Sequence, residues 1–125
     1  MSASPVSTSP VSRSLISTHV LDTARGRPAS GIAVTLQNND GTEIARSETD
    51  AAGRVGTLGP ESLVPGIYRL TFDTGAYFAA QTADENAAET FFPEVTLTFT
   101  VTAGEAHYHV PLLLSPFAYS TYRGN

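Results

Sequence analysis

The sequence predicts an all-β protein, a two-sheet antiparallel β-sandwich of about eight strands with one short helix. Beyond Ser14, short apolar runs alternate with Gly, Pro, Asn and Asp, which is the pattern of all-β chains. Several of these runs also alternate apolar with polar residues, which is typical of strands that bury one face and solvate the other. A single Ala-rich stretch lacks this alternation and predicts the helix.

Length and composition indicate a single folded domain. The chain has 125 residues, of which 41% are hydrophobic and 15% charged, enough for one buried core. Residues 1–13 are a polar mixture of Ser, Thr, Pro, Ala and Val, which buries too little surface to offset the entropy of ordering. We therefore expect a disordered tail over 1–13 and one domain over 14–125.

Two strands are predicted most clearly by their alternation. In residues 66–73, Tyr68, Leu70 and Phe72 share one face. In residues 94–102, four apolar side chains alternate with four threonines. Asn39-Asp40-Gly41 predicts a hairpin turn, because Asp-Gly tolerates positive φ angles. The remaining strands are expected at about 15–21, 32–38, 43–48, 53–57, 106–114 and 117–123.

The helix is expected over 75–82, where the Ala-rich sequence lacks β alternation. The polar segment that follows, residues 83–90, predicts a mobile loop.

Composition excludes several classes of function. A net charge of −5 argues against a nucleic-acid partner, since phosphate binding needs clustered positive charge. The absence of Cys excludes disulfides and thiolate zinc sites. All seven cations are Arg, so Schiff-base and Ser-Lys chemistry are excluded. Arg suits recognition of a flat, oxygen-rich ligand, although genomic base composition also explains this bias.

The sequence contains no membrane-spanning stretch. No apolar run approaches the roughly 20 residues that a transmembrane helix needs. The first residues also lack the long apolar segment of a secretory signal. We therefore expect a cytoplasmic protein, or a peroxisomal one in a eukaryote.

The histidines are the first candidates for chemistry. In residues 107–114, Tyr108, Val110, Leu112 and Leu114 form an apolar face, so His107 and His109 point the opposite way, out of the sandwich. If Phe117, Tyr119 and Thr121 face inward, then Ala118, Ser120 and Tyr122 flank the histidines. His19 and Leu21 share a face of their own strand.

These outward faces mix His and Tyr with Leu21, Leu113 and Pro111, which is apolar for a solvated surface. That composition predicts a contact between subunits with a shared site inside it. The alternative is that both histidines are surface residues of an edge strand. A metal site formed by His107, His109 and His19 is a further alternative, but nothing in the sequence enforces it, and we expect no metal and no cofactor. Nucleophile-elbow, zinc-protease and phosphate-loop motifs are all absent.

Several ordered motifs, spanning about residue 14 to the end, resemble a known family. They are Ser17-Thr-His-Val-Leu-Asp22, Gly26-Arg-Pro-Ala29, Thr49-Asp-Ala-Ala-Gly-Arg54, Gly75-Ala-Tyr-Phe, Phe91-Phe-Pro-Glu-Val95, His107-Tyr-His-Val-Pro-Leu-Leu-Leu-Ser-Pro116 and the terminal Tyr122-Arg-Gly. The chain is similar to the 5-hydroxyisourate hydrolases of the transthyretin superfamily. The resemblance implies a transthyretin-like sandwich.

The resemblance also implies an activity and a set of site residues. The activity is hydrolysis of 5-hydroxyisourate at its N1–C6 amide in urate degradation. His109 and His19 would orient and deprotonate a water, and Arg54 would hold the ring and stabilise charge on the attacked oxygen. Tyr122, Arg123, Gly124 and Asn125 would line the substrate end. His107 is not expected to be catalytic. Family members assemble as homotetramers, dimers of dimers, with sites between the dimers.

Two rival functions are weighed against this one. A transthyretin-like carrier of small ligands holds other residues at positions 19, 54 and 109, whereas His19, Arg54 and His109 are present here. A structural adhesion-type sandwich would need secretion and usually cysteines. One departure from the hydrolases is the final residue, Asn125, where the family ends in Ser. Its carboxamide still donates and accepts hydrogen bonds.

Overall fold

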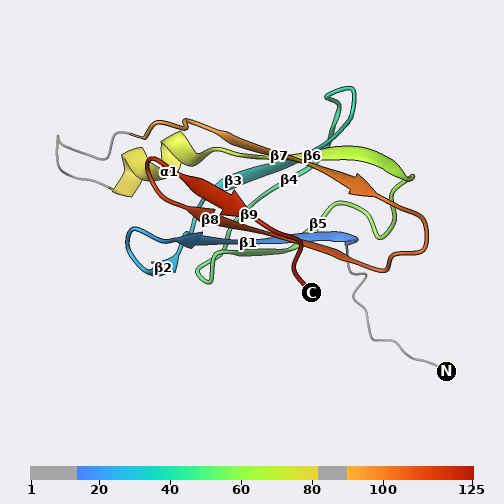
Figure 1. Ribbon diagram of the computed structural model, residues 1–125, viewed down its shortest axis with the longest axis horizontal. Coiled ribbons are helices and arrows are strands. Elements are labelled where there is room, and N and C mark those ends of the chain that lie inside the picture. Colours follow the sequence, from blue (N-terminus) through green and yellow to red (C-terminus); the bar gives the residue numbers. More distant parts are fainter. Residues whose placement is uncertain (1–13, 82–89) are drawn as a thin grey trace.

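The computed structural model describes residues 14–81 and 90–125 (Figure 1). The tail predicted over 1–13 lies outside these residues, as does the loop predicted over 83–90 apart from Thr90. The elements in chain order are β1 (Ile16–Asp22), β2 (Arg27–Pro28), β3 (Ala33–Asn38), β4 (Glu43–Glu48), β5 (Arg54–Leu58), β6 (Gly66–Phe72), α1 (Thr74–Gln81), β7 (Val95–Val101), β8 (Tyr108–Leu114) and β9 (Tyr119–Thr121).

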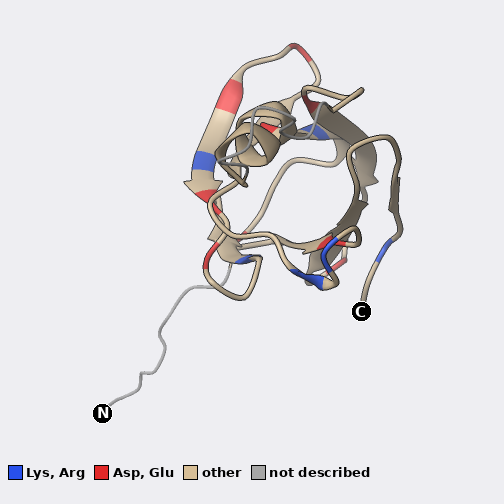
Figure 2. Ribbon diagram, turned by 90° about the vertical axis from the view of Figure 1, so that its left-hand side faces the viewer, with Lys and Arg blue, Asp and Glu red and all other residues tan. Residues whose placement is uncertain are grey.

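The strands form two facing sheets, which confirms the predicted sandwich (Figures 1 and 2). One sheet has the order β2-β1-β8-β9, with β5 also paired to β1. The other has the order β4-β3-β6-β7. α1 follows β6 and lies at one end of the sandwich. Within residues 14–81 and 90–125, no helix is long and apolar enough to cross a membrane.

One strand pair corrects the antiparallel prediction. β1 and β8 run parallel, from Ile16 opposite Tyr108 to Asp22 opposite Leu114, whereas every other strand pair is antiparallel. Parallel neighbours need a long crossover connection, and nearly the whole domain separates these two strands in the sequence. Alternation reports which face a strand buries but not its direction, so the sequence pattern could not reveal this pair.

The predicted elements match those observed, with differences at their ends. β9 covers only Tyr119–Thr121 instead of 117–123. β2 was not predicted, because two residues are too short to show a period. Phe117 was expected to face inward, but its side chain is 66% exposed. Pro116 precedes it in the bend between β8 and β9, where the chain leaves the sheet before the β9 register begins.

The core lies between the sheets and is formed by the alternating apolar faces. The predicted inward residues of β6 and β8 are all buried. Each such side chain contributes about 1.5–3 kcal/mol when it is fully removed from water. The largest fully buried ones are Phe72, Ile16, Ile32, Leu36, Leu58, Leu70, Leu112 and Leu114.

A buried polar contact ties the helix to β1. The Asp22 carboxylate, 1% exposed, accepts a 2.7 Å hydrogen bond from the Tyr77 hydroxyl. Its other oxygen accepts the backbone N–H groups of Ala24 and Arg25, each at 3.0 Å. Burial and the neighbouring carboxylate raise the pKa of Tyr77, so the hydroxyl stays a donor at neutral pH. This contact holds the C-terminal end of β1 in place.

The turn before β5 requires glycine. The Asp50 carboxylate accepts the backbone N–H groups of Ala52 and Arg54, each at 2.9 Å. Gly53 has φ +77°, and a Cβ there would lie 2.5 Å from the carbonyl oxygen of Val20 in β1. Only glycine lets the turn approach β1 this closely, and that approach sets Arg54 opposite His19.

We expect Gly53→Ala to destabilise the fold more than Gly41→Ala. Both glycines have positive φ, which costs alanine roughly 1–2 kcal/mol, but the space around Gly41 is open. The additional collision at Gly53 should lower the urea midpoint further than the control substitution does. Equal urea midpoints for the two variants would show that the close approach of the turn to Val20 does not require glycine at residue 53.

Candidate active site

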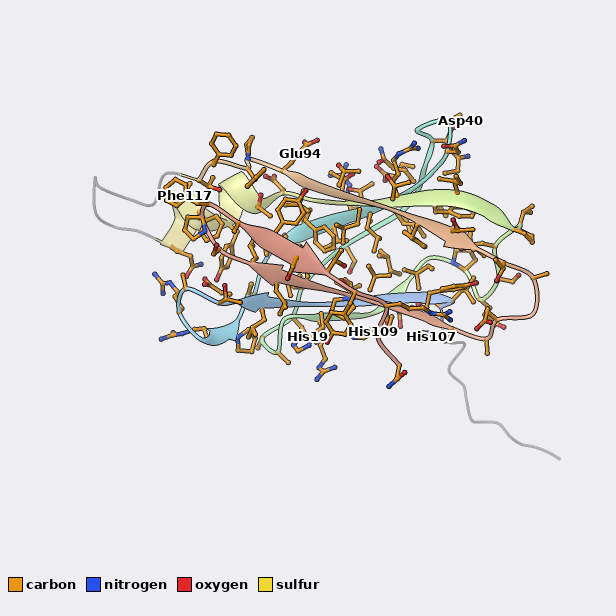
Figure 3. The ribbon with its side chains drawn as sticks, in the orientation of Figure 1. His19, Asp40, Glu94, His107, His109 and Phe117 are labelled. Atoms are coloured by element: carbon orange, nitrogen blue, oxygen red, sulfur yellow. The ribbon has the colours of Figure 1, made fainter. Side chains whose placement is uncertain are left out.

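The polar residues predicted for the site come together on the outer face of the five-stranded sheet. Ser17 lies opposite His109, and His19 lies opposite both Pro111 of β8 and Arg54 of β5. Because directly opposed residues point to the same face, these side chains share one side of the sheet. Figure 3 shows the three histidines in a row on the side of β1 and β8 that faces away from the second sheet.

A hollow of about 290 Å³ opens on this face. Its polar lining combines a cation with two imidazoles: it is formed by Ser17, Thr18, Arg54, Val55, Gly56, His107, His109 and Asn125. The predicted residues Arg54, His109 and Asn125 therefore meet in one place. His19 is not part of the lining, although it is adjacent to Arg54 in the strand register.

Ser17 is a site residue that the sequence analysis missed. Its Oγ lies 2.8 Å from Nε2 of His107 and 2.8 Å from Nδ1 of His109, so it bridges the two rings. The signal was available, because Ser17 and His19 are two positions apart and share a strand face. The parallel register that sets Ser17 against β8 could not be inferred from the sequence.

His109 is electrostatically suited to act as a base. Burial is the main cause that lowers the pKa of His109 below its ordinary value. Repulsion by His107, His19 and Arg54 lowers it further. The ring is therefore neutral at pH 7, with one nitrogen able to accept a proton.

The end of the chain lies against His109. The Gly124 backbone N–H donates a 2.8 Å hydrogen bond to the His109 carbonyl, forming a β-bridge. A Cβ at Gly124 would lie 2.7 Å from Cδ2 of the imidazole, so the glycine allows the backbone to pack on the ring. This contact brings Asn125 to the hollow.

Tyr122 and Arg123 are placed elsewhere. The Arg123 guanidinium forms a 2.9 Å ion pair with Glu105 and lies 4.5 Å from the centre of the Tyr108 ring. Both residues line a separate hollow of about 320 Å³, between the end of the chain and β7, with Leu97 and Phe99. The structure therefore separates the predicted terminal set, with Gly124 and Asn125 at the histidines and the other two beside β7.

Elsewhere in residues 14–81 and 90–125 no competing site of clustered charge is found. The described arginines are spread over loops and both sheets instead of gathering in one patch (Figure 2). In the part of the chain that the structure describes, no group of three or more His, Cys, Asp or Glu side chains is arranged to hold a metal ion.

The fold and this polar cluster define a transthyretin-like sandwich with a histidine and arginine site on its outer sheet face. The chain belongs to the HIUase/transthyretin family, whose sequence profile matches residues 16–124. The family predicted from the sequence motifs is thereby confirmed.

Relatives of known structure and sequence span nearly the whole chain. The sequence of this chain is 41% identical to that of the 5-hydroxyisourate hydrolase of Salmonella dublin over 127 residues, covering 98% of this chain and 90% of the relative. It is 42% identical to the 5-hydroxyisourate hydrolase of Mus musculus over 116 residues, covering 88% and 94%. The structure of Klebsiella pneumoniae 5-hydroxyisourate hydrolase matches with a TM-score of 0.79 and 39% identity, over 90% of this chain and 99% of that one.

The fold is also that of a transthyretin. The crystal structure of transthyretin from Sparus aurata matches with a TM-score of 0.77 and 34% identity, over 90% of this chain and 97% of that one. Fold similarity alone therefore does not separate a transthyretin from a 5-hydroxyisourate hydrolase, whereas the side chains of the site can.

We expect the His109 imidazole to titrate below the ordinary histidine value of 6.5. NMR titration of the ring C–H signals should show this midpoint directly. In Arg54→Gln the midpoint should rise, because one source of repulsion is gone while the burial stays. A wild-type midpoint at or above 6.5 would contradict a neutral, partly buried base at this position.

Proposed function

We propose that this protein hydrolyses 5-hydroxyisourate in urate degradation. The observation that carries the proposal is that His109, with a lowered pKa, and Arg54 line the same hollow. Relatives named 5-hydroxyisourate hydrolase, 41–42% identical over most of the chain, support this choice of substrate. A carrier of small ligands has no need of a neutral base beside a fixed cation.

In the proposed reaction, a water attacks the C6 carbonyl of the flat ring. His109 and His19 orient the water, and a neutral imidazole takes its proton as the new C–O bond forms. The guanidinium of Arg54 stabilises the negative charge that develops on the carbonyl oxygen. The N1–C6 bond then breaks, and N1 receives the proton from the imidazolium.

The product of this step is 2-oxo-4-hydroxy-4-carboxy-5-ureidoimidazoline. Water supplies the hydroxyl group that is added to C6 and the hydrogen that is added to N1 as the N1–C6 bond breaks, and the proton taken by the imidazole is returned within the same turnover. The proposed sequence therefore balances without a covalent enzyme intermediate or a cofactor.

In this proposal the last four residues bind the substrate and hold the end of the chain in place. Gly124 and Asn125 complete the substrate end, where the Asn125 carboxamide can donate to or accept from the ligand. Tyr122 and Arg123 belong to the same substrate-binding segment; Arg123 anchors it, and Tyr122 lines the hollow beside β7. The Arg123 contacts with Glu105 and Tyr108 hold the chain so that Gly124 can pack on His109.

We also propose that the protein forms a homotetramer, a dimer of dimers. Leu21 and Leu113 are opposite each other on the outer face of the sheet and only half-buried, and the Ala118 side chain nearby is exposed. Covering this apolar face with a second subunit would remove it from water and shield the shallow hollow from bulk solvent. The cytoplasmic location stays a prediction from the sequence.

Replacing His109 or Arg54 with Ala should lower kcat/KM for 5-hydroxyisourate by roughly 10²–10⁴-fold, the usual contribution of a general base or a charge stabiliser. The decay of freshly generated 5-hydroxyisourate, followed in the ultraviolet, measures this loss. Arg46→Ala is the matched control. Arg46 is exposed on β4 of the opposite sheet, where it forms an exposed ion pair with Glu43.

The control should keep the wild-type rate, since an exposed ion pair contributes little to stability. Near-normal turnover by a folded His109→Ala variant would refute the assignment of the base. A loss of similar size in Arg46→Ala would indicate a general effect of removing charge.

Asn125→Ser should change the efficiency only about two- to twelve-fold, which corresponds to one neutral hydrogen bond. Deleting residues 122–125 should be far more damaging, because it also removes the bridge from Gly124 to His109 and the anchor at Arg123. Steady-state kinetics on the two variants and wild type make the comparison. Full activity in the deletion would show that the end of the chain is not part of the site.

A further inference from the structure

Ser17 occupies a position that the reaction above does not use. Its side chain is nearly fully buried, and its hydroxyl lies between Nε2 of His107 and Nδ1 of His109 at 2.8 Å from each. Because Nδ1 of His109 is hydrogen-bonded to Ser17, Nε2 is the ring nitrogen that can contact a water in the hollow. The state of that nitrogen depends on how the protons are arranged around Ser17.

A serine hydroxyl has one proton to donate and lone pairs to accept. It can therefore donate to one of the two rings only, and it must accept an N–H from the other. If Ser17 donates to His107, then His109 carries its proton on Nδ1 and its Nε2 is free to act as a base. If Ser17 donates to His109, the proton of that ring is on Nε2, and the nitrogen available to a water is already protonated.

We propose that Ser17 and His107 are positioning residues that fix the tautomer of His109. His107 Nε2 accepts the Ser17 proton, which obliges Ser17 Oγ to accept from His109 Nδ1–H. The inference rests on the proposed function, in which His109 takes a proton from water. His107 affects the tautomer of His109 indirectly, through its hydrogen bond to Ser17.

The surroundings support this arrangement. Three positive or protonatable groups face His109: His107, His19 and Arg54. No carboxylate among the described residues is hydrogen-bonded to the ring, so Ser17 provides the side-chain partner that can orient it. The register fixes this partner, because Ser17 and His109 are directly opposed across the parallel pair of β1 and β8.

A comparison of three variants tests the proposal: Ser17→Ala, His107→Leu and His107→Gln. Long-range ¹⁵N–¹H NMR spectra of the free protein report the His109 tautomer and need no substrate. Wild type should show the proton on Nδ1. Ser17→Ala should lose this preference. In His107→Leu the Ser17 proton is released to His109, so the ring proton should move to Nε2.

His107→Gln is the matched control for His107→Leu, since its side-chain carbonyl can still accept the Ser17 proton. It should keep the wild-type tautomer and most of the activity. For Ser17→Ala and His107→Leu we expect kcat to fall about 10-fold or more, the effect of losing a hydrogen bond to a group that becomes charged, with KM nearly unchanged.

Two results would overturn the inference. One is a wild-type His109 with its proton on Nε2. The other is a Ser17→Ala variant that keeps both the Nδ1–H tautomer and the wild-type kcat. Since the NMR measurement is made without substrate, it stays decisive even if 5-hydroxyisourate is not the substrate. Absence of turnover by wild type would count against the proposed function alone.

Discussion

The position of β1 between two partners is the constraint on which the site depends. One edge of β1 pairs in parallel with β8, and the other pairs with β5. The first pairing sets Ser17 against His109, and the second sets His19 against Arg54. A slip of one residue in either register would turn these side chains to the opposite face of the sheet. The packed core, which buries Ile16, Thr18 and Val20 of β1, prevents such a slip.

The same scaffold separates the residues that build the core from those that build the candidate site. The inward faces of the strands build the core, while the outward faces are free to differ. In this chain the outward positions hold imidazoles and a guanidinium, and burial keeps the His109 ring neutral. Two local devices preserve that arrangement: the Gly53 turn, which brings β5 close to β1, and Gly124, which packs the end of the chain on the imidazole.

The sequence predicted most of the fold, because alternation and turn residues are local signals. Tyr68, Leu70 and Phe72 face the core as their spacing indicated. The parallel pairing of β1 with β8 could not be predicted, because alternation does not show in which direction a strand runs. For the same reason the sequence did not show that Ser17 meets His109. The contacts of the Arg123 guanidinium with Glu105 and Tyr108 also have no local signal in the sequence. Family motifs gave the candidate site residues, and the strand register shows which of them lie together.

The most direct test of this account is whether the wild-type protein accelerates the decay of freshly generated 5-hydroxyisourate. The decay would be followed in the ultraviolet with and without catalytic amounts of protein, and with heat-denatured protein as a control. A hydrolase with this site should give a rate that is proportional to the concentration of native protein and saturates with substrate. A decay rate equal to the spontaneous one at every protein concentration would contradict it.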